Sequence, residues 1–181
     1  MLLLSCSSGS TQASTVSTCA PGKLPNAGNG MLITRDQSLA SRDMKSGSEC
    51  NLLNAPPGEF FTYPAWAPDG KQFAYVLDKP FQGDTTADYG DDMYVADANG
   101  QNQHVILHHT KSGEQYESLN WSLDAKSILF SYFYTDYDSQ GQYKGQVYEA
   151  RSIDVASGTV TPSVVPNANG TDVCRTGASL T

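Results

Sequence analysis

The sequence predicts an all-β protein in which a unit of four antiparallel strands recurs about three times along 181 residues. The first observation behind this prediction is composition. Ten Tyr, six Phe and two Trp stand mostly in short runs bounded by Gly, Pro, Asp and Asn, which is typical of strands and tight turns. The second is an internal repeat of about 55 residues, a length that suits one four-stranded unit.

The bulk composition limits the classes of function that the protein can have. A content of 39% hydrophobic and 17% charged residues favours a compact fold. The formal net charge is -8 and the eleven Lys and Arg are scattered, so no basic surface is expected that could bind nucleic acid. No segment approaches the roughly 20 apolar residues that a membrane-spanning helix needs.

The N-terminus changes abruptly from apolar to polar. Residues 3–6, Leu-Leu-Ser-Cys, resemble the bacterial lipobox. This resemblance implies that residues 1–5 are the remnant of a lipoprotein signal, that Cys6 is lipidated and that residues 6–29 form a Ser/Thr-rich tether. It further implies an exported protein, anchored to a membrane by lipid on its periplasmic or cell-surface face. Because the basic and apolar regions of a full secretory signal do not precede Cys6, a cytosolic tail with an unrelated cysteine is the alternative.

Three further cysteines bear on the redox compartment. Cys19 and Cys50 flank the first strand-like segment and could close a loop by a disulfide in an oxidising compartment. Cys174 is then free or pairs elsewhere, because an odd number of cysteines cannot all pair within one chain. Zinc is not predicted, since the sequence has no Cys-x-x-Cys pair.

A tryptophan motif occurs twice at constant spacing. The segment from Tyr63 to Val76 matches the segment from Ser118 to Ser131. Three residue pairs are each 55 positions apart: Trp66 and Trp121, Asp69 and Asp124, Lys71 and Lys126. This regularity indicates a duplicated structural unit.

A second motif, an aspartate followed closely by glycine, occurs three times. Its aspartates are Asp43, Asp97 and Asp154, separated by 54 and 57 positions. Together, the turn at Pro68-Asp69-Gly70 and the Asp-to-Gly turn each join two strands, which gives four strands per unit.

Alternation within one predicted strand shows how the units pack. Phe73 and Tyr75 fall on one face, while Ala74 and Val76 fall on the other, so both faces are expected to be covered. Trp66 and Trp121 are expected to fill the space between neighbouring units. In the later copy Leu123 and Ala125 replace the proline and glycine of the turn, and a different turn geometry is expected there.

The run from Trp66 to Lys71, followed by the run from Met93 to Gly100, resembles the TolB-type, WD-like β-propeller repeat. The resemblance covers roughly residues 30–165 and implies a partial propeller. Its expected parts are blades over 30–55, 60–110 and 117–165, followed by a tail or the start of a further blade over 166–181. Because known propellers have about four to eight blades, three do not close a ring, and open blade faces invite a partner.

The connections within the two clearer blades are acidic and aromatic, and they fall at equivalent positions of the repeat. Loops at one end of a propeller commonly carry binding function. The candidate binding residues are Asp84, Asp88, Tyr89, Asp91, Asp92, Tyr134, Asp136, Tyr137 and Asp138. Such tyrosines are suited both to binding a partner and to packing on a neighbouring blade.

Two segments have residues that could bind a metal ion or could serve only as surface residues. Asp136 and Asp138, with Gly141, look like the start of a calcium loop, but the position of the bidentate acid holds Val147, so an EF-hand is excluded and a solvated turn is favoured. The histidines within residues 103–110 are expected to be solvent-facing residues of an edge strand. Calcium is therefore only a weak alternative to having no cofactor.

The resemblance favours a non-enzymatic binding or scaffold module of the cell envelope that acts through a protein partner. No catalytic residues are assigned, because neither a Gly-x-Ser-x-Gly nor a His-Glu-x-x-His motif is present. The alternative is the propeller portion of a secreted peptidase or polysaccharide lyase.

Overall fold

The structure, a computed structural model, describes residues 14–15, 30–80 and 89–163. These residues form three four-stranded antiparallel sheets, referred to as blades A, B and C. Blade A comprises β1 (Ser14–Thr15), β2 (Gly30–Arg35), β3 (Ser38–Asp43) and β4 (Glu49–Asn54). Blade B comprises β5 (Phe60–Trp66), β6 (Gln72–Lys79), β7 (Gly90–Asp97) and β8 (His104–Leu107). Blade C comprises β9 (Gln115–Trp121), β10 (Ser127–Tyr137), β11 (Tyr143–Asp154) and β12 (Val160–Pro162).

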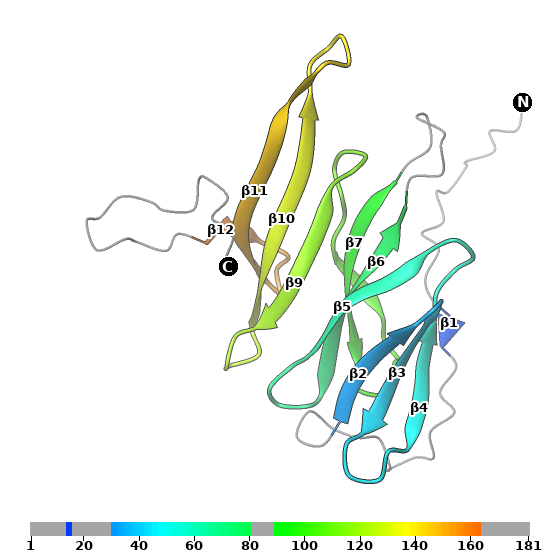
Figure 1. The fold of residues 1–181 in the computed structure, drawn as a ribbon. Helices are drawn as coiled ribbons and strands as arrows, with labels where there is room; N and C mark the ends of the chain where they lie inside the picture. Colours follow the sequence, from blue (N-terminus) through cyan, green and yellow to red (C-terminus); the bar gives the residue numbers. More distant parts are fainter. Residues whose placement is uncertain (1–13, 16–29, 81–88, 164–181) are drawn as a thin grey trace, which may run out of the picture.

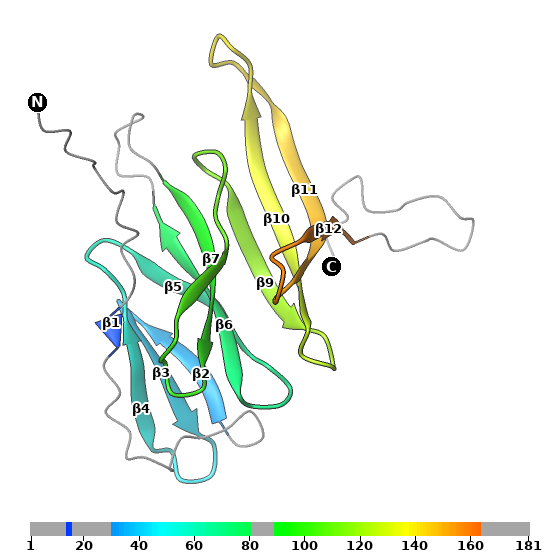
Figure 2. The same cartoon turned by 180° about the vertical axis from the view of Figure 1, so that it is seen from behind.

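The predicted fold class, about three four-stranded antiparallel blades, is confirmed. Blade B lies between blades A and C, as Figures 1 and 2 show from opposite sides. The described residues contain no helix that could cross a bilayer.

Both faces of blade B are buried, as the alternation in β6 predicts. Phe73 and Tyr75 belong to the apolar cluster shared with blade A. Ala74 and Val76 belong to the cluster shared with blade C. Burial of a large apolar side chain stabilises the fold by about 1.5–3 kcal/mol, so these two interfaces contribute most of the stability of the three packed blades.

Blade A differs from the other two in its strand order. The motif aspartates Asp43, Asp97 and Asp154 end β3, β7 and β11, so these three strands are equivalent. Blades B and C each have an inner strand, β5 or β9, paired with the strand that precedes this aspartate strand. Among the described residues no strand takes this place in blade A, where β2 pairs with β3 alone.

The fourth strand of blade A instead lies at its opposite edge, where Ser14 and Thr15 pair with Asn54 and Leu53 of β4. The predicted Ser/Thr-rich tether over 6–29 thus includes a two-residue strand at these positions. The physical reason is that β4 would otherwise expose an unpaired sheet edge, and an extended Ser-Thr pair can satisfy it.

The turn of the tryptophan motif has the same geometry in both copies, contrary to the expectation from Leu123 and Ala125. Ala67 N–H donates to the Gln72 carbonyl at 2.9 Å, and Ser122 N–H donates to the Ser127 carbonyl at 2.8 Å. Gly70 has φ 68° and Ala125 has φ 56°, both left-handed. Strand pairing therefore dictates the turn, and Ala125 is held in a conformation that glycine adopts more easily.

Cys50 of β4 is disulfide-bonded. The other three cysteines, including Cys6 and Cys19, lie outside the described residues. The pairing of Cys50 with Cys19 and the lipidation of Cys6 thus stay predictions.

Candidate functional site

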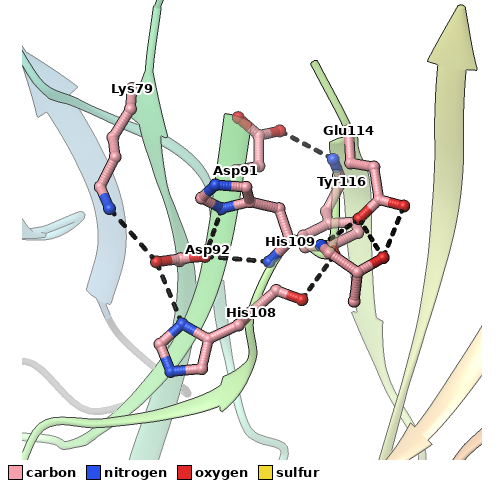
Figure 3. A network of polar contacts seen from close by, with 8 residues as sticks. Lys79, Asp91, Asp92, His108, His109, Glu114 and Tyr116 are labelled. Carbon is pink, nitrogen blue, oxygen red and sulfur yellow. Dashed lines mark hydrogen bonds and ion pairs between the residues drawn. The ribbon is translucent and has the colours of Figure 1, made fainter. Parts of the chain in front are cut away.

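Two of the predicted loop carboxylates, Asp91 and Asp92, lie inside β7 and are almost fully buried. The prediction that they belong to a surface loop is therefore wrong. Strand β7 begins at Gly90, and each carboxylate finds partners in neighbouring elements, which makes burial tolerable. These two residues form the centre of a polar network at the junction of blades B and C (Figure 3).

Asp92 contacts residues of blade B and of the connection that follows β8. It accepts hydrogen bonds from His109, from the backbone N–H at 3.0 Å and through Nδ1 at 2.7 Å. Its other oxygen is 3.5 Å from Lys79 Nζ and 3.3 Å from His108 Nδ1. Burial alone would raise the pKa of Asp92, but the contacts with His109 and Lys79 lower it to about 2. Asp92 is therefore charged near neutral pH.

His109 does not follow the expectation of a solvent-facing edge histidine. Its side chain is only 6% exposed, whereas that of His108 is 62% exposed. Strand β8 ends at Leu107, so His109 already belongs to the connection that leads into blade C. No local sequence pattern indicates this, because the partner Asp92 is 17 positions away.

Asp91 faces the other way, toward blade C. Its Oδ2 accepts a 2.7 Å hydrogen bond from the Tyr116 N–H of β9. Across the β6–β7 ladder it is paired with Asp78, a second carboxyl group. Burial, together with this like-charged neighbour, raises the pKa of Asp91 to about 7. The pair thus holds a proton near neutral pH.

Glu114 completes the network at the end of the connection between β8 and β9. It accepts hydrogen bonds from the Thr110 N–H and hydroxyl and from the Tyr132 hydroxyl at 2.8 Å. The Arg151 guanidinium lies 3.5 Å from the centre of the Tyr132 ring, a cation–π contact. Every group of the network has a protein partner, so its evident role is to fix the interblade connection rather than to bind a ligand.

The second feature is a ribbon that protrudes beyond the rest of the molecule (Figure 1). The last β10 residue paired with β9 is Phe133, opposite Gln115, and the strands β10 and β11 continue past it as a two-stranded hairpin. Near its tip Tyr137 and Tyr143 are 55% and 62% exposed, with ring centres 6.3 Å apart. Two exposed aromatic rings on a hairpin are suited to docking against a protein surface.

The predicted site residues of this hairpin divide between structural and exposed positions. Tyr134 lies under Lys111, whose Nζ is 4.5 Å from its ring centre. Asp136 pairs with Lys144 at 3.1 Å. Asp138 caps the turn by accepting from the Gln140 and Gln142 N–H groups at 2.9 and 2.8 Å. Tyr137 alone among them presents a largely free side chain.

Asp136 and Asp138 form the weak calcium candidate, but each carboxylate already has a partner in the hairpin. Within residues 30–80 and 89–163 no group of three or more His, Cys, Asp or Glu side chains is arranged to hold a metal ion. Of the first acidic loop, Tyr89 packs against Gly113, while Asp84 and Asp88 lie outside the described residues.

The motif aspartates stabilise the turns in which they lie. Asp43 and Asp154 each accept from backbone N–H groups of the following turn, which lowers the pKa of both. Asp97 accepts from Asn102 Nδ2 at 2.6 Å, and Asp69 accepts from the Lys71 N–H at 3.0 Å. Asp124 accepts from the Ser122 hydroxyl at 2.7 Å.

The two tryptophans contribute to the interblade packing in different ways. Trp121 of β9 reaches back to blade B, where its Nε1–H donates to the Ala65 carbonyl of β5 at 3.0 Å. Trp66 of β5 packs edge-on against Phe73, with ring centres 5.4 Å apart. Its Nε1–H is buried and has no acceptor among the described residues.

The outer face of blade C is open. In blade B the equivalent face is largely buried, with Val76 and Met93 at 0% exposure. On blade C, Leu129 and Tyr148 are 43% and 51% exposed, and the Tyr148 ring lies 4.7 Å from that of Phe133. An aromatic pair therefore stands where blade B has the carboxyl pair Asp78 and Asp91.

Comparison with known proteins places the fold. No protein-family model and no curated protein matches the sequence. The structure is similar to that of a TolB protein from Agrobacterium tumefaciens, with a TM-score of 0.52 and 17% identity over 75% of this chain. It is also similar to an acylaminoacyl peptidase from Pyrococcus horikoshii, with a TM-score of 0.50 and 14% identity over 81% of this chain. The chain spans 45% and 27% of the lengths of these two proteins. It therefore has the fold of a partial β-propeller of the TolB-like kind.

Proposed function

We propose that this protein is a non-enzymatic module of the cell envelope that binds a protein partner through the hairpin of β10 and β11. The observation that carries this proposal is the exposed pair Tyr137 and Tyr143 at the tip of the protruding ribbon. Tyrosine offers a large contact area with few rotatable bonds, and it is enriched in protein interfaces.

The envelope location is supported by two further observations. Cys50 is disulfide-bonded, and disulfides persist in oxidising compartments outside the cytosol. The fold is similar to part of a TolB protein. With the lipobox-like residues 3–6, these favour a protein that is exported and held at a membrane by lipid on Cys6.

The test is capture of partners by the full chain in a cell-envelope extract, followed by measurement of the affinity for each recovered protein. Replacing both tyrosines (Tyr137→Ser and Tyr143→Ser) is expected to weaken binding about tenfold or more, because exposed aromatic anchors dominate interfaces. The fold should be unchanged, since this part of the ribbon extends beyond β9. Equal capture by both forms would refute the hairpin as the binding site.

The matched control is Leu123→Ser. Leu123 is an exposed apolar residue as well, at 95% exposure, but it lies in the turn after β9. Its replacement should leave the affinity unchanged.

A second candidate is the propeller portion of a larger peptidase or lyase. It is favoured by the likeness to the acylaminoacyl peptidase, of which this chain spans 27%. Turnover of peptide or polysaccharide substrates by the purified chain would contradict the non-enzymatic proposal, and a hydrolase or lyase domain encoded in the same reading frame would favour the second candidate.

A further inference from the structure

Blades B and C enclose a cleft at the end of the blades opposite to the hairpin tip (Figure 1). Its volume is about 520 Å³, within the roughly 300–1,000 Å³ of sites that bind small molecules. Gln72, which begins β6, and His104, which begins β8, line it on the side of blade B. The turn before β10 and the turn after β11 line it on the side of blade C.

Backbone contacts fix the walls of this cleft. The Val155 N–H donates to the Lys126 carbonyl at 2.9 Å, which joins the two turns of blade C. The second of these turns also touches blade B, because a Cβ atom placed on Gly158 would lie 3.5 Å from the Ile106 carbonyl. The cleft is therefore formed before any ligand binds, as is usual for sites that take small molecules.

The lysine of the cleft differs from its equivalent in blade B. Lys71 of blade B pairs with Asp69 at 3.8 Å. In blade C the equivalent aspartate, Asp124, accepts instead from the Ser122 hydroxyl at 2.7 Å. Lys126 forms no direct ion pair within the described part of the chain. Its ammonium group is thus available to an anionic group in the cleft.

The carboxylate of Asp154 likewise differs from its equivalent. Its two hydrogen bonds from Ser157, each of 2.8 Å, both go to Oδ1. The equivalent Asp97 uses Oδ2, which accepts from Asn102 Nδ2 at 2.6 Å, and no described side chain donates to Oδ2 of Asp154. The hydrogen bonds from Ser157 lower the pKa of Asp154 most, and the charge of Lys126 adds to this effect. The two charged groups are thus near each other without forming an ion pair.

Blade B supplies neutral polar groups across the cleft. His104 Nδ1 lies 3.1 Å from the Asn102 carbonyl, and since a carbonyl can only accept, Nδ1 carries a proton and Nε2 remains for a ligand. The side-chain amide of Gln72 has no hydrogen-bond partner among the described residues. The remaining lining residues are small and apolar, and they suit a short apolar group: Ala125, Val155 and Ala156.

We propose that this cleft binds a small zwitterion, of the class of free α-amino acids and short peptides. The carboxylate of the ligand pairs with the Lys126 ammonium, and the ammonium of the ligand pairs with Asp154 Oδ2. Gln72 and His104 supply neutral hydrogen bonds. A simple anion would be repelled by Asp154 and a simple cation by Lys126, so a ligand that carries both charges is favoured over either.

This site is separate from the proposed partner-binding hairpin. Strand β10 begins at Ser127, beside the cleft, and ends at Tyr137, which in an extended strand is about 33 Å away. Tyr137→Ser with Tyr143→Ser should therefore keep zwitterion binding, and Lys126→Gln should keep partner capture. Either proposal can fail without the other.

The experiment titrates the isotope-labelled full chain with four probes and follows its amide signals by NMR. The probes are L-alanine, L-alanyl-L-alanine, acetate and methylammonium. At least one of the two zwitterions is expected to bind with a dissociation constant of about 1 mM or below and to shift the signals of Lys126 and of residues 154–156. Acetate and methylammonium each lack one charge and should bind about tenfold more weakly or less. The tighter zwitterion distinguishes a free amino acid from a peptide.

Two variants and a matched control test the assignment of the charged groups. Lys126→Gln removes the ammonium, and Asp154→Asn keeps an oxygen that can accept from Ser157. Each should raise the dissociation constant of the zwitterion about tenfold. The control, Lys71→Gln, makes the same change at the equivalent turn of blade B, where the ammonium is already paired, and should leave the constant unchanged.

Three outcomes would overturn the proposal. The first is the absence of saturable binding of either zwitterion up to about 20 mM. The second is an affinity for acetate or methylammonium equal to that for the zwitterions. The third is an equal effect of Lys71→Gln and Lys126→Gln. Unchanged amide signals away from the cleft would show that the variants keep the fold.

Discussion

Ala125 and Gly70 occupy the same turn position in successive blades, with φ 56° and 68°. A left-handed conformation costs an L-residue other than glycine about 1 kcal/mol or more. We therefore expect Ala125→Gly to raise the free energy of unfolding by about 0.5–1 kcal/mol and Gly70→Ala to lower it by about 1 kcal/mol. Urea denaturation of both variants measures this, and destabilisation by Ala125→Gly would contradict the shared geometry.

Asp91 makes stability depend on pH. Its pKa is raised to about 7 in the fold, against 3.8 for an unperturbed aspartate. Between these values the folded protein keeps a proton that the unfolded chain has released. The stabilising effect is complete below about pH 4 and is lost as the pH rises through about 7.

The test of this dependence is Asp91→Asn, which imitates the protonated form. The free energy of unfolding of the unmodified protein should fall by about 2 kcal/mol more than that of the variant between about pH 5 and pH 7.5. The groups facing Asp91 are Asp78 of β6 and Glu117 of β9, and both remain in the variant, so the difference reports the proton that Asp78 and Asp91 share. Parallel pH profiles for the two proteins would contradict the raised pKa.

At the scale of elements, the repeat in the sequence was sufficient to predict three sheets and the two-faced burial of β6. Turn aspartates and alternating aromatic residues are local signals, and a strand bounded by such turns has few alternatives. The bounds of β7 were harder to predict. Asp91 and Asp92 are polar residues that a composition argument assigns to a loop, and only contacts with β9 and with His109 allow them to lie in a strand.

The polar network and the absence of an inner strand in the described part of blade A could not be predicted from the sequence, because both depend on contacts between distant positions. Asp92 and His109, or Glu114 and Tyr132, are 17 and 18 positions apart and carry no motif spacing. The strand order of blade A depends on which strands pair, and the alternation of apolar and polar residues does not specify the pairing partner. The hairpin tyrosines, in contrast, were predictable, because polar turn residues surround them.

At the scale of the whole molecule, blade B packs against a neighbouring blade on both faces, whereas blade C does so on one face. Met93 of blade B is fully buried, and the equivalent residue of blade C, at a spacing of 57, is Ala150. We expect Met93→Ala to destabilise the fold by about 2–5 kcal/mol, as deletion of a buried large side chain does.

Ala150→Met is the matched reverse change, and on the open face it should alter the stability of the monomer by less than about 0.5 kcal/mol. Thermal unfolding of the two variants provides the comparison. Similar losses in both would mean that the face of blade C is already covered within one copy.

If Cys6 carries a lipid, as proposed, the pairing of Ser14 and Thr15 with β4 places the attachment on the side of blade A. Strand β4 and its partner β1 lie at the outer edge of blade A, so a lipid attached upstream of Ser14 would connect this edge to the membrane. The hairpin of β10 and β11 belongs to blade C, which blade B separates from β1 (Figure 1), so neighbours in the envelope could reach it without contacting the site of attachment.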